Sequence, residues 1–155
     1  MSRKANLILL LYATLLGPAP LGANWGSELV DISEIDSSII IELRYATTNN
    51  FTGKIIYRSN RALLRRDVTK RLAEVQEELE ESGLGLKVWD AYRPFSIQQR
   101  FWKLVPDDRY VAQPTTWYGR PLDGSKHNRG AAVDVTLVDL KTGRELEMPS
   151  AFDDF

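Results

Sequence analysis

The stretch Ser125–Leu140, SKHNRGAAVDVTLVDL, is the most informative part of this chain, because a polar loop runs directly into a strongly apolar segment. Residues 131–140 are rich in β-branched and apolar side chains, which predicts a strand. Side chains alternate along a strand, so Asp134 shares its face with Ala132 and Thr136. A carboxylate in such a strand is costly to bury unless it is paired or bound to a metal.

His127 precedes Asp134 by seven residues in the pattern Ser-x-His-x-x-Gly-x-Ala-x-Asp, and it is the only histidine in the chain. A neutral imidazole and a carboxylate are ordinary zinc ligands, and a catalytic zinc takes three protein ligands and keeps a fourth position open. Gly130 gives the loop backbone freedom, and Ala132 leaves space beside a metal. The pattern therefore predicts half of a zinc site.

Each of the two residues also has a simpler explanation. A salt bridge to an arginine would account for Asp134, and a structural hydrogen bond would account for His127. With one histidine and no cysteine, the chain offers only carboxylates such as Asp153 or Asp154 as a substitute third ligand.

Composition narrows the classes of function. The chain has 155 residues, of which 43% are hydrophobic, which is typical of one globular domain with a real core. Its 20 basic and 21 acidic residues give a formal charge of -1, which argues against nucleic acid or an anionic membrane as a partner. The absence of cysteine excludes disulfides, thiolate metal sites and a cysteine nucleophile.

The first 23 residues are typical of a secretory signal peptide. Arg3 and Lys4 precede an apolar run at 7–16, and the small-residue stretch at 21–23 favours cleavage after Ala23. The alternative, a membrane anchor, needs about 20 apolar residues, roughly twice this run. We therefore predict a signal peptide at 1–23, a single domain at 24–155, no stable membrane anchor, and a secreted or periplasmic location.

Periodicity and turn residues predict the other elements. They indicate strands at 39–45, 86–90 and 131–140, helices at 67–82 and 96–102, an irregular segment at 106–126, and a hairpin turn at 141–143. Asp67 and Ser96 are the expected helix N-caps, and Gly83 is the expected stop of the longer helix. The loop at 50–53 is a candidate pocket edge.

Five motifs occur in order along the chain: LRYAT at 43–47, NFTG at 50–53, WDAYRP at 89–94, the Ser-x-His…Asp pattern at 125–134, and Phe-Asp at 152–153. Together they resemble the zinc-dependent D-alanyl-D-alanine dipeptidases of the VanX type, relatives of D,D-carboxypeptidases and of the Hedgehog signalling domain. The resemblance implies an α+β fold, a single small domain with a central, mostly antiparallel sheet packed by helices.

The resemblance also implies roles for individual residues. His127 and Asp134 would be zinc ligands, and Arg93 would polarise the scissile carbonyl and stabilise the oxyanion formed from it. A guanidinium offers fixed donors to developing negative charge, although Arg93 could instead form an ion pair with Asp90.

Three further positions match the family's substrate pocket. Asp153 corresponds to the residue that holds the substrate's free ammonium group, and Ser125 and Tyr45 correspond to residues that line the dipeptide pocket. The segment before Asp153, Met148–Ser150, contains a proline where the family usually has glycine, so the turn there is expected to differ.

In the family, the chain continues to a Glu-x-x-His motif that supplies the general base and the third zinc ligand, whereas this sequence stops at Phe155. The expectation is therefore a C-terminally truncated member, incomplete in its sheet. The implied activity is hydrolysis of D-Ala-D-Ala in cell-wall peptide turnover. The alternatives are a D,D-carboxypeptidase acting on muropeptides, or a non-catalytic remnant.

Overall fold

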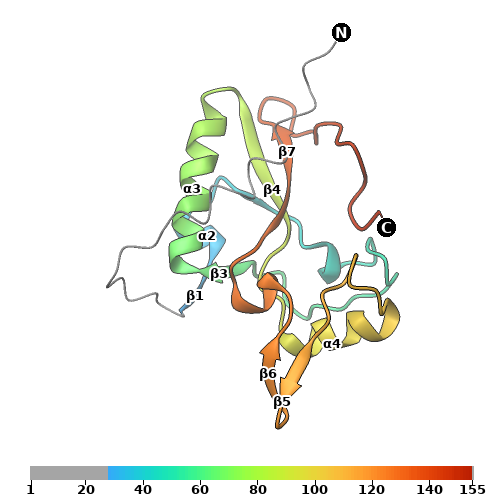
Figure 1. Cartoon of the computed structure of the whole chain (residues 1–155). Helices are drawn as coiled ribbons and strands as arrows, with labels where there is room; N and C mark the ends of the chain where they lie inside the picture. Colours follow the sequence, from blue (N-terminus) through green and yellow to red (C-terminus); the bar gives the residue numbers. More distant parts are fainter. Residues whose placement is uncertain (1–27, 155) are drawn as a thin grey trace.

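The computed structural model describes residues 28–154 (Figure 1). The predicted signal peptide at 1–23 lies outside the described residues and stays a prediction. Within the described part, no helix is both long and apolar enough to cross a membrane.

Three small sheets and three α-helices make up the described domain. In chain order the elements are β1 (Leu29–Asp31), α2 (Ile32–Ile35), β2 (Ile40–Ile41), the 3-10 turn η1 (Arg44–Ala46), β3 (Leu63–Arg65), α3 (Arg66–Glu80), β4 (Leu84–Asp90), α4 (Phe95–Leu104), β5 (Thr115–Trp117), β6 (Arg120–Asp123), the 3-10 turn η2 (Lys126–Arg129) and β7 (Asp134–Asp139). The sheets have the orders β2-β4-β7, β1-β3 and β5-β6, and only the β2–β4 pair is parallel. The predicted α+β class with a mostly antiparallel sheet is confirmed.

Strand β4 lies at the centre of the largest sheet, and α3 covers one face of it (Figure 1). Leu72 of α3 packs with Leu86 and Val88 of β4, all at most 3% exposed. The predicted spacing of apolar residues in this helix explains the contact, because residues three and four apart share a helix face. Burial of this face is the main source of the domain's stability.

The register between β4 and β7 determines which residues of the two strands lie opposite each other at the site. The two strands pair antiparallel, and an irregularity between Val88 and Asp90 brings Asp90 opposite Asp134. Such a bulge re-aims side chains at the end of a strand. As a result, the motif that follows β4 meets the strand that starts with Asp134 at one end of the sheet.

Both predicted helix caps were wrong. Helix α3 begins at Arg66, so Asp67 lies in the first turn, where its negative charge interacts favourably with the helix dipole instead of capping it. Helix α4 begins at Phe95 directly after Pro94, which places Ser96 inside the helix. Gly83 does follow the end of α3, and its N–H donates to the Glu80 carbonyl, as expected of a stop residue.

Two other expectations needed correction. The strand predicted at 39–45 is only two residues long, because η1 turns the chain at 44–46. The segment at 106–126 was expected to be irregular but contains the hairpin β5–β6, joined by Tyr118 and Gly119. Both residues have positive φ, +46° and +75°, the geometry of a tight two-residue hairpin turn.

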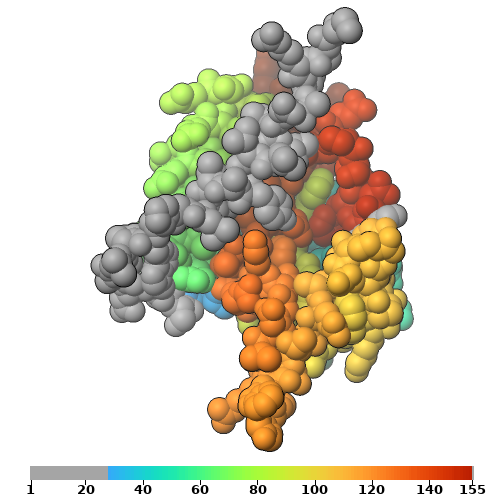
Figure 2. Space-filling view, in the orientation of Figure 1, coloured from blue at the N-terminus to red at the C-terminus, as the bar shows by residue number. Residues whose placement is uncertain are grey.

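The β5–β6 hairpin projects from the body of the domain, at the lower end of Figure 2. Every residue of its two strands is exposed. Besides its own hydrogen bonds, the hairpin has a contact between the Trp117 and Tyr118 rings, whose centroids lie 5.0 Å apart, and an ion pair between Asp123 and Arg129.

Candidate metal centre

The loop that carries His127 is held by local hydrogen bonds. The Ser125 hydroxyl accepts from the backbone N–H of His127, and the Asn128 side chain accepts from the backbone N–H of Ser125. Gly130 ends this turn with φ +61°, in the left-handed region that favours glycine. A side chain there would also meet Leu29 and the backbone of Arg65, so the glycine of the motif is required by both conformation and space.

The His127 ring is fixed by its Nδ1 atom, which lies 2.9 Å from the carbonyl oxygen of Ala91. A carbonyl only accepts, so this contact assigns the proton to Nδ1 and leaves the Nε2 lone pair free. Nε2 lies 3.5 Å from Oδ1 of Asp134. Two atoms that each bind a tetrahedral zinc at about 2.0–2.1 Å are about 3.3–3.4 Å apart, so this pair fits the ion.

The contact between the two predicted ligands shifts the pKa of both groups. Burial lowers the pKa of His127, but its contact with Asp134 outweighs burial and raises the pKa above its ordinary value. Burial raises the pKa of Asp134, but His127, together with the charge of Arg93, lowers the pKa by more. In the described chain no arginine lies within ion-pair distance of Asp134, so the salt-bridge alternative for this residue is not realised.

Asp90 completes a group of three with His127 and Asp134, whose ligand atoms lie within 4.8 Å of one another. Its own oxygens, however, already have partners. Oδ1 accepts from the Tyr57 hydroxyl and the Ala91 N–H, and Oδ2 accepts twice from Arg93. A carboxylate offers about four acceptor sites. Asp90 therefore supports the site through Arg93, and within residues 28–154 the members of this group with a ligand atom still available are His127 and Asp134.

Arg93 lies next to His127 because the two motifs share backbone hydrogen bonds. The Arg93 N–H donates to the His127 carbonyl, and the Asn128 side chain donates to the Arg93 carbonyl. The guanidinium forms the ion pair with Asp90 that was the alternative explanation for this residue, with Nη2 and Oδ2 2.6 Å apart. Arg93 therefore forms this ion pair and also lies next to His127 at the candidate site.

Asp153 approaches the site from the other end of the chain. Its Oδ1 accepts from the Tyr45 hydroxyl at 2.9 Å, and its Oδ2 accepts from the Phe51 N–H at 3.3 Å. Burial raises the pKa of Tyr45, so this phenol stays a neutral donor. Burial and the charge of Asp134 raise the pKa of Asp153 despite these hydrogen bonds. The carboxylates of Asp153 and Asp134 are therefore close enough to interact electrostatically.

The predicted substrate residues thus lie in two places. Tyr45 and Asp153 contact each other beside the loop at 50–53, which was the expected pocket edge. Ser125 lies on the His127 loop, where its hydroxyl oxygen caps η2. No hydrogen bond connects Ser125 with either of the other two among the described residues.

Sequence reasoning missed two residues that contact Arg93 or its partner Asp90. Tyr57 donates to Asp90 at 2.6 Å, and Gln98 accepts from Arg93 at 2.9 Å. Gln98 is fully buried in α4, and a helix that begins two residues after the WDAYRP arginine was the one available signal. Tyr57 lies in a loop whose path the sequence pattern did not indicate.

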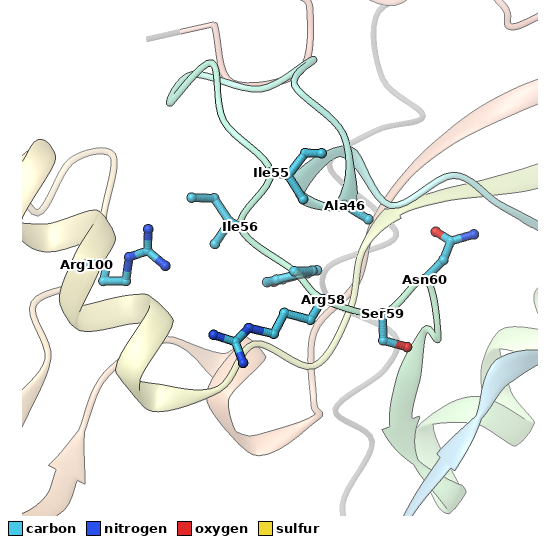
Figure 3. Close-up of a pocket in the computed structure, with 8 residues that line it drawn as sticks. Ala46, Ile55, Ile56, Arg58, Ser59, Asn60 and Arg100 are labelled. Atoms are coloured by element: carbon cyan, nitrogen blue, oxygen red, sulfur yellow. The ribbon is translucent and has the colours of Figure 1, made fainter.

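Two cavities of about 560 Å³ each border this region. One is lined by the Tyr57 ring together with Arg58 and Arg100, as Figure 3 shows for the two arginines, and it contains none of the predicted site residues. The other is lined by Trp89, Thr136 and residues of the C-terminal segment such as Phe152, and it too contains none of the predicted site residues. Trp89 Nε1 and Thr136 Oγ1 are buried beside it with no hydrogen-bond partner among the described residues.

An α+β domain with an imidazole and a carboxylate positioned for a metal ion, and an arginine beside them, defines a candidate metallohydrolase. Comparison with known proteins agrees with this class. A protein-family model described as D-ala-D-ala dipeptidase matches residues 26–155. This chain therefore belongs to the D-alanyl-D-alanine dipeptidase family, as its motifs predicted.

Individual proteins similar to this chain include several D-alanyl-D-alanine dipeptidases. The chain is 41% identical over 128 residues to a D-alanyl-D-alanine dipeptidase of Escherichia coli, which covers 83% of this chain and 62% of that protein. It is 36% identical over 135 residues to one from Streptomyces coelicolor, covering 79% and 67% of the two chains. One from Enterococcus faecalis is 35% identical over 127 residues, covering 72% and 62%. The chain thus spans about two thirds of the length of these relatives.

Proposed function

We propose that this protein hydrolyses the D-alanyl-D-alanine dipeptide with the help of zinc, outside the cytoplasm, in the turnover of cell-wall peptides. The observation that carries the proposal is the His127 imidazole, fixed by Ala91 so that Nε2 faces Asp134 at 3.5 Å. The similarity to three D-alanyl-D-alanine dipeptidases supports this choice of substrate.

His127 and Asp134 would hold the metal. A bound zinc activates water for attack and polarises a carbonyl oxygen as a Lewis acid. Binding and charge stabilisation depend on the described residues, whereas the resemblance assigns the transfer of a proton from the water to the leaving amine to the glutamate of the family's Glu-x-x-His motif. Arg93 has N–H groups beyond those used by its partners, and they would donate to the negative charge that develops on the carbonyl oxygen. Such a preorganised donor is typically worth about 3 kcal/mol of transition-state stabilisation.

Asp153 would bind the free ammonium group of the dipeptide, and Ser125 remains a proposed pocket residue. Tyr45 and the Phe51 N–H hold the Asp153 carboxylate in one orientation. Less side-chain conformational entropy is therefore lost when a ligand binds. A carboxylate in this place favours a dipeptidase over a D,D-carboxypeptidase, because the longer muropeptides have an amide where the dipeptide has its ammonium group.

The test uses the native protein purified from its source and supplied with zinc. It would be incubated with D-Ala-D-Ala, L-Ala-L-Ala and N-acetyl-D-Ala-D-Ala, and release of alanine would be followed by proton NMR. We expect cleavage of the first peptide alone. Preferential cleavage of the acetylated peptide would favour the carboxypeptidase, and binding of D-Ala-D-Ala without turnover would favour the non-catalytic remnant.

Arg93→Ala provides the matched test of the arginine. We expect it to lower kcat/KM by about 100-fold or more, since one oxyanion donor is typically worth that much. Arg109→Ala is the control, because Arg109 is exposed and forms an ion pair with Asp107, which is not part of the candidate site. An equal loss in both variants would argue against a role for Arg93 in the reaction.

The location is proposed from residues 1–23 alone. N-terminal sequencing of the protein isolated from cell envelope fractions is expected to begin at Asn24. A chain that keeps Met1 and remains with the cytoplasmic fraction would contradict this part of the proposal without affecting the rest.

A further inference from the structure

The ion pair between Arg93 and Asp90 has an unusual geometry. Both Nε and Nη2 of the arginine donate to the same oxygen, Oδ2, at 3.2 and 2.6 Å. The other oxygen is occupied by the Tyr57 hydroxyl and the Ala91 N–H. In the usual fork, two parallel bonds to two oxygens fix the plane of the guanidinium. Two bonds to one oxygen fix the distance between the guanidinium and Asp90. They leave the plane of the guanidinium able to rotate about that oxygen.

Gln98 provides the missing second point of attachment. Its Oε1 accepts from Arg93 Nη1 at 2.9 Å, on the arm of the guanidinium that Asp90 does not contact. The Gln98 Nε2 donates to the Ala112 carbonyl at 2.7 Å. A flipped amide would place a donor against Nη1 and an acceptor against a carbonyl, so the amide has one satisfactory orientation.

The surroundings strengthen this attachment. Gln98 is 0% exposed and Arg93 is 8% exposed, so both groups are largely removed from competing water. Phe101, three residues after Gln98 on the same face of α4, lies with its ring centroid 4.8 Å from the guanidinium carbon. The Tyr45 ring lies 5.4 Å from the same carbon. Helix α4 therefore contributes both the acceptor and one of two aromatic faces that contact the guanidinium.

We propose that Gln98 is the positioning residue that sets the plane of the Arg93 guanidinium. Of five guanidinium N–H groups, Asp90 takes two and Gln98 takes one, which leaves up to two for a ligand beside the neighbouring Tyr57 hydroxyl. The direction of the remaining donors depends on the plane that Gln98 sets. As a statement about the reaction, this inference rests on the proposed hydrolysis of D-Ala-D-Ala.

The kinetic test compares Gln98→Met with Gln98→Glu in the native, zinc-loaded protein. Methionine keeps the volume but loses the acceptor, and we expect kcat to fall about 10–100-fold with KM changed less than about threefold, because the donors act on charge that develops in the transition state. Gln98→Glu keeps an oxygen that accepts from Arg93 Nη1, so it is expected to recover most of the loss. Gln99→Met, an exposed neighbour on α4, is the control.

A second readout does not depend on activity. The Arg93 Nε–H signal in a ¹⁵N NMR spectrum, assigned by its loss in Arg93→Lys, is expected to be rigid in the wild type and in Gln99→Met. In Gln98→Met its order parameter should fall and its exchange with water should accelerate. If the wild type does not cleave the dipeptide, the proposed function fails, and this measurement still decides the positioning role.

Two results would overturn the inference. One is a Gln98→Met variant that keeps wild-type kcat or, without turnover, the wild-type order parameter at Arg93. The other is a loss of kcat that is fully explained by a smaller folded fraction, measured by thermal unfolding, with Gln98→Glu no better than Gln98→Met. Gln98 would then be only a link between α4 and the loop at Ala112.

Discussion

At the scale of single residues, the metal pair leads to a direct prediction. We expect the protein to bind one zinc ion, and His127→Ala or Asp134→Asn to weaken that binding by more than the 10–100-fold typical when a ligand merely loses its hydrogen-bond partner. Isothermal titration with zinc would measure this. Asp123→Asn is the control, because Asp123 is an exposed carboxylate paired with Arg129. Unchanged affinity in His127→Ala would exclude the imidazole as a ligand.

Gly130 gives a second prediction at this scale. Gly130→Ala would place a Cβ 2.5 Å from a Leu29 methyl and 3.2 Å from the Arg65 nitrogen, in addition to the strain of its positive φ. Gly143→Ala has a similar φ, +68°, and open space. We expect the control to lose about 1 kcal/mol of unfolding free energy and Gly130→Ala to lose about 1 kcal/mol more, measured by urea unfolding. Equal losses would mean that the chain relaxes around the methyl group.

Part of the site could be predicted residue by residue, and part could not. His127 and Asp134 belong to one short motif, so local spacing was enough to pair them. Asp153 also matched a motif, but its contact with Tyr45 spans 108 residues, which no local pattern can report. Gln98 and Tyr57 were missed because polar residues in a helix and a loop are usually solvated, and only the tertiary structure shows them buried around Arg93.

At the scale of elements, α3 and β4 are joined by a side chain as well as by apolar packing. Gln76, fully buried in α3, accepts from the Leu86 N–H of β4 at 2.8 Å. Gln76→Leu would leave that N–H buried without a partner, and we expect a loss of about 1–3 kcal/mol of unfolding free energy in chemical denaturation. Glu77→Leu, exposed on the same helix, should stay within about 0.5 kcal/mol. A similar small change in both would show that water reaches Leu86.

Strand β4 also carries a partly buried lysine, Lys87, whose ion pairs with Glu42 and Glu145 predict a pH dependence. Burial lowers the pKa of Lys87, but hydrogen bonds and charges from Glu145 and Glu42 outweigh it, so the pKa is raised. Because the folded pKa exceeds the unfolded value, the stabilisation is fully present below about pH 10.5 and is lost as the pH rises through the folded pKa. The stability difference between wild type and Lys87→Met should therefore shrink at high pH.

Lys70→Met is the control for this measurement, because Lys70 is exposed on α3. Urea unfolding at pH 8 and at pH 11 would compare the two variants with the wild type. A Lys87 difference that is the same at both values would mean that the lysine contributes through the packing of its stem and not through its charge.

Elements were predicted well where one periodicity ran long enough. The helix at 66–80 and the strand at 84–90 follow apolar patterns that tertiary contacts reinforce. The short elements β2 and η1 were not predicted correctly, because their conformation depends on the neighbouring strand and not on a local sequence pattern. The β5–β6 hairpin was missed because its turn uses Tyr118, a bulky residue that rarely adopts positive φ.

At the scale of the whole molecule, stability is unevenly distributed. The β2-β4-β7 sheet is buried against α3, whereas the β5–β6 hairpin is exposed along its length. Native-state hydrogen exchange is expected to show the slowest amides in β4 and fast exchange in β5 and β6, since exposed hydrogen bonds open without global unfolding. Equal protection in both regions would contradict this picture.

The contact between Tyr45 and Asp153 also affects the order in which the site can assemble during folding. It joins positions 108 residues apart, so the proposed ammonium-binding carboxylate is oriented only after a long loop has closed. His127 and Asp134 lie within eight residues of each other and do not depend on that closure. The folding chain can therefore bring the proposed metal-binding pair together before it can orient the carboxylate proposed to recognise a substrate ammonium.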